Sequence, residues 1–245
     1  MPCHDAVPPL VDEELHIWRI DLRPWGAWRG ELESLLEPGE RERAARFRFD
    51  RLTLGFTIAR ARQRVILARY LGADPSALRF VKGEHGKPAL THPVVSPPLD
   101  FNLSHSGDYV LLAVARGRRI GVDLEDASRS IGEMEEIAER FFAPGECVAL
   151  RSVPDEDRRR AFFACWTRKE AYIKAVGTGL SMRLDSFEVE LRPGEPVAFR
   201  SIGGDPVAAE AWRLIEIDPG PGYAGALCHE GPALKLCLFE DRPPA

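Results

Sequence analysis

Ile120-Gly121-Val122-Asp123-Leu124-Glu125 is the stretch that decides the fold of this 245-residue chain. Apolar side chains alternate in it with the acidic Asp123 and Glu125. In a β-strand, residues two positions apart project from the same face, roughly 6.6 Å apart along the backbone. The pattern therefore predicts a strand with one apolar face and two carboxylates side by side on the other.

A second informative stretch, Trp166-Thr167-Arg168-Lys169-Glu170-Ala171-Tyr172-Ile173-Lys174, lies in a predicted helix over 157–176. At ~100° per residue the apolar residues of this helix share one face, and Glu170 falls on the same arc. One interpretation is an exposed Glu170 that pairs with Lys174, which is worth only ~0.3–0.5 kcal/mol. The other is a buried carboxylate, which needs a partner because an unpaired buried charge is costly.

Asp123 and Glu125 alone also fit the solvent face of a half-exposed strand. Two neighbouring carboxylates repel each other, however, and a cation would remove the repulsion. Together with Glu170 they offer three oxygen ligands, the type that Mg²⁺ takes. Three carboxylates and Lys174 one helical turn further on indicate chemistry on a phosphate.

Composition narrows the class of protein. A net charge of −5 argues against a nucleic-acid-binding protein, which normally carries a basic patch or stripe. Two local groups of arginines suit a small polyanion or an acidic partner, or else form exposed helix faces laced with ion pairs. The groups are Arg41, Arg43, Arg46, Arg48 and Arg51, and then Arg60, Arg62, Arg64 and Arg69.

The cysteines and the hydropathy pattern indicate a cytoplasmic protein with no membrane association. Five cysteines, an odd number with no C-x-x-C pair, fit a reducing compartment better than a disulfide framework. The longest apolar run, 110–115, is far short of the ~18 residues of a membrane span. Residues 1–14 show no apolar segment typical of a signal peptide.

The order of expected elements divides the chain near Arg118, with helices followed by strands in each half. Segments 107–116 and 222–231 both run from a glycine and a tyrosine into a small apolar strand, a weak sign of duplication. No low-complexity linker separates the halves, so we expect them to contact each other. Strands are expected at 15–22, 78–81, 100–103, 109–115, 120–125, 187–191, 212–217 and 223–228, and helices from 38, over 54–68, and at 132–142, 144–151 and 157–176.

Two loops complete the candidate site. Lys82-Gly83-Glu84-His85-Gly86-Lys87-Pro88 has glycines that let the backbone approach a ligand and lysines that can meet phosphate, although most such loops are simply turns. Asn102-Leu103-Ser104-His105-Ser106 ends a predicted strand with small polar groups. His105 fits a structural role as well as a functional one.

These motifs resemble the surfactin-type 4′-phosphopantetheinyl transferase family. The resemblance is carried by Asn102–Ser106, by Gly121–Glu125, by Trp166-x-x-Lys169-Glu170-Ala171-x-x-Lys174 and by Gly86-Lys87-Pro88. It runs from about residue 40 to about residue 191. It implies an α+β fold, a pseudo-dimer of two similar α/β half-domains with the active site in the cleft between them. Residues 1–118 would form the half with the coenzyme A-binding loops, and 119–245 the half with the carboxylates and the catalytic helix.

The resemblance implies a reaction and its site residues. The 4′-phosphopantetheine arm of coenzyme A would move to a serine of an apo acyl or peptidyl carrier protein, releasing adenosine 3′,5′-bisphosphate. Asp123, Glu125 and Glu170 would hold Mg²⁺, with Glu170 and Lys174 catalytic. Coenzyme A would be bound by Arg51, Lys82, His85, Lys87, Ser104, His105 and Lys169. Since one chain holds both halves, the resemblance implies a monomer.

Two other functions stay open at this point. A metal-dependent phosphodiesterase or nuclease also uses clustered acids and a lysine, and a non-catalytic coenzyme A-binding module would keep the fold. The acidic balance counts against the first and the intact acids against the second. The sequence leaves open the carrier proteins, the choice of Mg²⁺ or Mn²⁺, the use of acylated coenzyme A, the identity of the base and the role of 40–43, where some relatives carry lysines.

Overall fold

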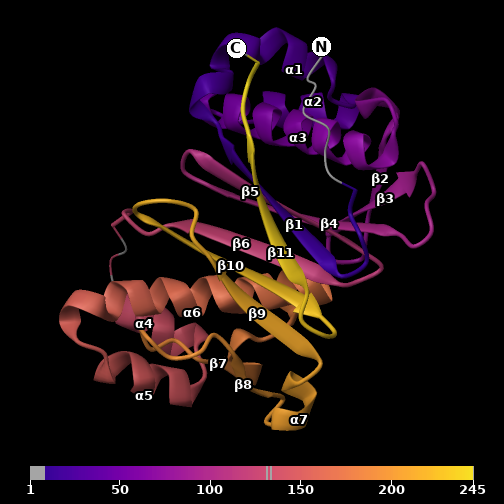
Figure 1. The fold of residues 1–245 in the computed structure, drawn as a ribbon. Helices are drawn as coiled ribbons and strands as arrows, with labels where there is room; N and C mark the ends of the chain where they lie inside the picture. Colours follow the sequence, from indigo (N-terminus) through magenta and orange to yellow (C-terminus); the bar gives the residue numbers. More distant parts are fainter. Residues whose placement is uncertain (1–8, 131, 133, 245) are drawn as a thin grey trace.

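A computed structural model describes residues 9–130, 132 and 134–244 (Figure 1). Cys3 and Glu133, the latter in the predicted helix 132–142, lie outside these residues. Within the described part no helix is long and apolar enough to cross a membrane.

Two similar halves make up the structure, which confirms the predicted fold class. Each half has a strand, a long helix and a pair of strands in that order. The first has β1 (Glu14–Asp21), α3 (Asp50–Leu71), β4 (Leu99–Ser106) and β5 (Tyr109–Arg116), and the second has β6 (Ile120–Asp126), α6 (Asp155–Val176), β9 (Trp212–Ile217) and β10 (Tyr223–Glu230). The strand orders β1-β5-β4 and β6-β10-β9 correspond, as does the antiparallel pairing of every neighbour.

The two long helices also correspond. Each spans 22 residues and ends at a glycine in the left-handed region, Gly72 at φ 59° and Gly177 at φ 82°. Glycine adopts this conformation without the cost that a Cβ imposes, so it is the usual residue just past a helix. The likeness of segments 107–116 and 222–231 is therefore the likeness of β5 and β10, the central strands of the two halves.

Four layers follow from how these elements pack (Figure 1). The first core cluster lies between α3 and the sheet of β1, β5 and β4, and includes Ile20, Ile58 and Val110. A second joins the inner faces of the two sheets, where Val122 and Leu124 of β6 meet strands β1 and β5. The third lies between α6 and the sheet of β6, β10 and β9. Because Val122 and Leu124 face the other sheet, Asp123 between them faces α6.

The last strand, β11 (Lys235–Asp241), returns to the first half and pairs in parallel with β1. Sequence reasoning did not predict this strand. Its final residue, Asp241, accepts two hydrogen bonds from Arg62 of α3, both 2.7 Å long, in a fully buried ion pair. The division at residues 118 and 119 stays a prediction, but 235–241 belong to the sheet of the first half.

The remaining elements surround these layers. Short helices α1 (Arg29–Ser34) and α2 (Pro38–Ala45) contact α3, while α4 (Met134–Phe141) and α5 (Pro144–Ser152) precede α6. The others are the hairpin of β2 (Arg79–Lys82) and β3 (Pro88–His92), the pair β7 (Phe187–Val189) and β8 (Phe199–Ile202), and α7 (Pro206–Ala209). Of these, α1, β3, β8 and α7 were not predicted, and β4 continues to Ser106, beyond the predicted strand 100–103.

The arginines of α3 correct one interpretation of the basic groups. Arg62 and Arg64 are buried, so this part of the group is not an exposed helix face. Arg64 pairs with Glu40 of α2 at 2.9 Å and Arg62 with Asp241. Both guanidinium groups therefore hold elements together.

Candidate functional site

Gly121 explains why α6 lies so close to β6. A Cβ at this position would stand 2.2 Å from the carbonyl oxygen of Ala171 and 2.3 Å from the nitrogen of Ala175. Only glycine permits this approach of strand and helix backbones. As a result Glu170 and Lys174 of α6 lie beside Asp123 of β6.

Lys174 and Asp123 are the centre of this arrangement. Lys174 Nζ donates to Asp123 Oδ1 at 2.5 Å and to Ser104 Oγ at 2.9 Å. Ser104 Oγ in turn donates to Asp123 Oδ1 at 3.0 Å. Asp123 is only 3% exposed, and its second oxygen, Oδ2, is buried without a hydrogen-bond partner among the described residues. A buried, unpartnered carboxylate oxygen is costly, so this atom marks a place for a cation or a donor.

The negative charge of Asp123 affects the pKa values of the two other carboxylates, Glu125 and Glu170. Burial raises the pKa of Glu170 and that of Glu125, and the negative charge of Asp123 raises both further. The three acids predicted to meet therefore do share one environment. Their donor set, three carboxylates and no sulfur or imidazole, is the chemistry that Mg²⁺ prefers.

The three acids are not drawn tightly together in this structure. Among the described residues, the group of His, Cys, Asp or Glu side chains whose ligand atoms all lie within 4.8 Å of one another is Glu14, His16 and Cys237. One ion would therefore need Glu125 or Glu170 to move toward Asp123. The unpartnered Oδ2 and the mutual repulsion of the acids still fit a divalent cation here.

A side-chain ladder holds β6 in register with β4. Asn102 Oδ1 accepts a hydrogen bond from the N–H of Val122 at 2.8 Å, and Ser106 Oγ accepts one from the N–H of Asp126 at 2.9 Å. Between them the N–H of Leu124 donates to Ser104 Oγ at 3.3 Å. Three alternate residues of one edge strand thus serve three alternate N–H groups of the other. This ladder fixes which way Asp123 faces.

A cleft of about 260 Å³ opens beside the carboxylates. Glu170 and Lys174 line one side of it, and the loop with His85 and Lys87 lines the other. Lys87 turns its ammonium group to the backbone, where it donates to the carbonyls of Ile120 at 2.8 Å and Ala175 at 3.1 Å. Burial lowers the pKa of Lys87 to about 8.

Two further cavities continue from this cleft. Basic side chains line both, and Glu37 and Glu40 also line the one next to the cleft. The cavity next to the cleft has a volume of about 270 Å³ and shares Gly86 and Pro88 with the cleft. The other has a volume of about 490 Å³ and shares Arg43 and Lys82 with the cavity of about 270 Å³. Arg46 and Arg60 add to the lining. Sequence reasoning did not select Arg43, Arg46 or Arg60. The arginine clusters were the available signal, but their pattern did not tell lining residues from buried ones.

His105 and Arg51 were also predicted to bind coenzyme A, and they lie on different elements, β4 and α3. His105 lies on β4 next to Ser104, and its side chain is exposed although its ring is crowded by protein. Partial desolvation lowers the pKa of His105, and the positive charges of Lys174 and Arg60 lower it further. Arg51 is exposed in the first turn of α3 and lines none of the three cavities.

The prediction that Lys169 binds coenzyme A is corrected. Lys169 is fully buried, and its ammonium group donates to the carbonyls of Leu184 at 2.8 Å and Phe187 at 2.6 Å. It also pairs with buried Glu146 at 2.8 Å. Consecutive residues of a helix point ~100° apart, so Lys169 faces the core of the second half while Glu170 faces the cleft.

Two family models match the chain. One, described as 4′-phosphopantetheinyl transferase superfamily, matches residues 119–228, and the other, described as 4′-phosphopantetheinyl transferase, N-terminal, matches residues 24–117. The chain is 39% identical to 4′-phosphopantetheinyl transferase HetI of Nostoc sp. (strain PCC 7120) over 91% of this chain and 90% of that one. It is 33% identical to 4′-phosphopantetheinyl transferase Sfp of Bacillus subtilis (strain 168), over 81% and 84% respectively.

Proposed function

The chain belongs to the 4′-phosphopantetheinyl transferase superfamily and modifies carrier proteins, and from that premise we propose how its site performs the transfer. Coenzyme A lies along the cleft and the two cavities that adjoin it. Asp123, Glu125 and Glu170 would hold Mg²⁺ at the cleft, with Glu125 or Glu170 moving toward Asp123 to do so. The single observation that carries this proposal is the buried, unpartnered Oδ2 of Asp123 beside two acids of raised pKa.

When bound, the divalent cation supplies charge stabilisation at the phosphoryl oxygens and orients the leaving group. The chain's own residues do the rest. The serine hydroxyl of the carrier attacks the phosphorus that bears the pantetheine arm, and the bond from that phosphorus to the bridging oxygen breaks. Adenosine 3′,5′-bisphosphate leaves with the bridging oxygen and its electron pair.

Lys174 supplies a positive charge where this oxygen becomes negative. Its ammonium group already lies at the mouth of the cleft, anchored by Asp123 and Ser104. Such a fixed donor needs no rearrangement at the moment of reaction, which is why preorganised charges are effective in catalysis.

Glu170 takes the proton of the serine hydroxyl. A general base works best when its pKa approaches the working pH, and burial together with Asp123 raises the pKa of Glu170 in that direction. A carboxylate has two oxygens, so Glu170 can hold the cation with one and receive the proton with the other.

The basic cavities suit the phosphates of the adenosine end. Arg43, Arg46 and Lys82 line the larger of them, and a guanidinium group meets a phosphate with two parallel hydrogen bonds. His85, Ser104 and His105 lie closer to the carboxylates, beside the pyrophosphate in this proposal. Lys87 acts through the backbone carbonyls that it holds. Arg51 lines none of these cavities, so this proposal assigns it no direct contact with coenzyme A.

Both halves of the site come from one chain, so we propose an active monomer that uses neither nucleic acid nor a membrane. The cleft ends at Glu170 and Lys174, where the carrier serine must approach. A cytoplasmic location is part of the proposal, because the cysteine pattern fits a reducing compartment.

The proposal is tested by incubating the protein with coenzyme A, Mg²⁺ and a panel of apo carrier proteins, with intact mass as the readout. We expect one carrier serine to gain the mass of the arm and adenosine 3′,5′-bisphosphate to appear in equal amount. Omission of Mg²⁺ is the control for the metal. Cleavage of coenzyme A or of DNA without mass gain on several carriers would instead support a phosphodiesterase.

A further inference from the structure

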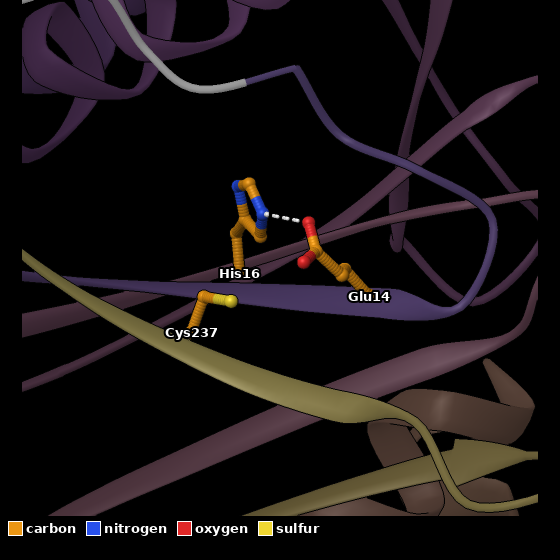
Figure 2. Close-up of side chains that lie close together, drawn as sticks. All are labelled: Glu14, His16 and Cys237. Carbon is orange, nitrogen blue, oxygen red and sulfur yellow. Dashed lines mark hydrogen bonds and ion pairs between the residues drawn. The ribbon is translucent and has the colours of Figure 1, made fainter.

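Glu14, His16 and Cys237 lie together at the β1/β11 pair (Figure 2), and none of them lines the cleft or the two cavities beside it. Glu14 and His16 are two positions apart on β1, so they project from the same face. Cys237 is the register partner of His16 on β11. A carboxylate oxygen, an imidazole nitrogen and a sulfur all lie within 4.8 Å of one another. We propose that these three side chains form a second metal site that takes one zinc-class ion.

The histidine is held as a metal-ligating histidine usually is. His16 is fully buried, and its Nδ1 lies 2.7 Å from Tyr70 Oη, which also accepts a 2.7 Å hydrogen bond from Trp18 Nε1. A group outside the ligand set that fixes the second ring nitrogen sets the tautomer and the orientation of the ring. The other nitrogen, Nε2, faces Glu14 Oε2 at 3.3 Å. Burial lowers the pKa of His16, which favours the neutral ring that a metal ligand needs.

The same geometry argues against a nucleophilic cysteine with a histidine base. In such a triad the ring stands between the thiol and the carboxylate, with one nitrogen for each. Here Tyr70 engages Nδ1, so the thiol and the carboxylate both have only the Nε2 side available. Two ligands that converge on one nitrogen's side are what a shared ion needs.

The ligand types select the metal. A thiolate and an imidazole suit Zn²⁺ and similar borderline ions, whereas Mg²⁺ takes oxygen ligands only. With Zn–N and Zn–S bonds of ~2.0–2.3 Å, ligand atoms of a tetrahedral site lie about 3.3–3.6 Å apart, close to the 3.3 Å between His16 and Glu14. Cys237 and Glu14 are half-buried, which leaves a route for the ion and a fourth position for water.

Binding of the metal ion releases one proton. The thiol of Cys237 loses its proton to solvent, and the neutral His16 ring takes the tautomer with its single proton on Nδ1, donated to Tyr70 Oη, which frees Nε2 for the ion. Lys235 keeps its 2.8 Å hydrogen bond to Oε1 of Glu14, so Oε2 is the oxygen that faces the ion. No oxidant or reductant takes part.

Such an ion would hold β11, the last strand, to β1. β11 is an edge strand, and among the described strands it pairs with β1 alone. Its far end is held by the buried pair of Asp241 and Arg62. An ion at Cys237 would tie the middle of β11 to β1. Because it binds the folded chain, it would also stabilise that chain against unfolding.

The test uses the full chain at saturating Mg²⁺, titrated with Co²⁺ as a spectroscopic substitute for Zn²⁺. We expect one Co²⁺ per chain, with ligand-field bands of a tetrahedral ion and a thiolate-to-cobalt charge-transfer band in the near ultraviolet. Cys237→Ser should abolish the charge-transfer band and weaken Co²⁺ binding more than ~10-fold. Cys147→Ser, which changes a cysteine outside the proposed ligand set, is the matched control and should keep the band.

A second readout separates ligation from folding. Zn²⁺ should raise the melting temperature of the wild-type chain and not that of Cys237→Ser, while both transfer the phosphopantetheine arm at equal rates with Mg²⁺. Cys237 is half-buried on an edge strand, so its serine variant should fold even if variants of buried His16 do not. A charge-transfer band that survives Cys237→Ser, or no binding of Co²⁺ by the wild-type chain, would overturn the proposal.

Discussion

Lys174 Nζ lies 2.5 Å from Oδ1 of Asp123 and so joins the last turn of α6 to β6. The side chain of Asp123 is almost fully buried, whereas 29% of the Lys174 side chain is exposed. The ammonium group thus reaches from the protein interior to the mouth of the cleft. It neutralises part of the acidic cluster and, in the proposed mechanism, faces the place where the leaving oxygen becomes negative.

Lys174→Met should lower kcat about 10²–10³-fold, the usual effect of removing one fixed donor to a developing charge. Because the Lys174 side chain is partly exposed, a methionine should fit in its place, so the melting temperature should fall little. Initial rates of mass gain on a carrier give kcat, and Arg183→Met, an exposed arginine outside the site, is the control. A kcat within twofold of wild type would remove Lys174 from the proposed mechanism.

Gly121→Ala should destabilise the chain by about 1–3 kcal/mol, the usual cost of overpacking. The new Cβ would meet backbone atoms of Ala171 and Ala175 at 2.2–2.3 Å, and neither atom can rotate away. α6 must therefore shift, and Glu170 with it, so the Mg²⁺ requirement should also rise. Urea unfolding measures the first effect and a Mg²⁺ titration of the rate the second. Gly30→Ala, where the Cβ meets nothing within 4 Å, is the matched control and should not destabilise.

Asn102→Ala should destabilise the chain by about 1–3 kcal/mol, because it leaves the N–H of Val122 buried without a partner. Since this bond belongs to the ladder between β4 and β6, the concentration of Mg²⁺ for half-maximal rate should rise as well. Ser128→Ala, which removes an exposed hydrogen bond to Asp126, is the control. Equal effects of the two substitutions on the Mg²⁺ requirement would contradict a positioning role for Asn102.

Much of the fold could be predicted because its signals are local. Alternation in 120–125 and helical periodicity in 157–176 describe β6 and α6 well. β11 could not be found this way, since its partner β1 begins 221 residues earlier and no local pattern encodes that pairing. Pairing across such a separation is decided by the packed core of both halves.

The site shows the same limit. Asp123, Glu125, Glu170 and Lys174 were singled out from the sequence pattern and the family resemblance. The structure places Glu170 and Lys174 on the lining of the cleft, with Asp123 hydrogen-bonded to Lys174 and Glu125 in the same electrostatic environment. Lys169 was misassigned because the sequence does not say which arc of α6 faces Glu146. The grouping of Glu14 with Cys237 also escaped prediction, because it depends on the register of β1 and β11.

Mg²⁺ should stabilise the folded chain, and more strongly at neutral than at acidic pH. The pKa values of Glu125 and Glu170 lie above 4.5 in the folded chain, so between 4.5 and these values the folded state binds more protons than the unfolded state. The free energy of unfolding without metal therefore falls as pH rises through this interval. At ~100 times its dissociation constant, Mg²⁺ adds about 2.7 kcal/mol, and protons compete with it at acidic pH.

Thermal unfolding with Mg²⁺ or a chelator, at acidic and neutral pH, measures this effect. The double variant Glu125→Gln/Glu170→Gln should be more stable than wild type without metal and should gain nothing from Mg²⁺. Glu195→Gln, an exposed residue outside the site, should behave as wild type. A Mg²⁺ stabilisation that persists in the double variant would place the ion elsewhere.

Lys87 should give the chain an alkaline gain in stability. Its pKa is about 8 in the folded chain against 10.5 when exposed, because burial disfavours the ammonium form. Between these values the unfolded state binds more protons, so the free energy of unfolding rises with pH across this window. Each pKa unit corresponds to ~1.4 kcal/mol, and partial exposure reduces the total gain in the free energy of unfolding to about 1–3 kcal/mol.

Urea unfolding near pH 7 and near pH 10 measures this gain. Wild type should gain this much relative to Lys87→Met, but not relative to Lys82→Met, whose lysine is exposed. A constant difference between wild type and Lys87→Met across the window would show that burial does not desolvate the ammonium group of Lys87.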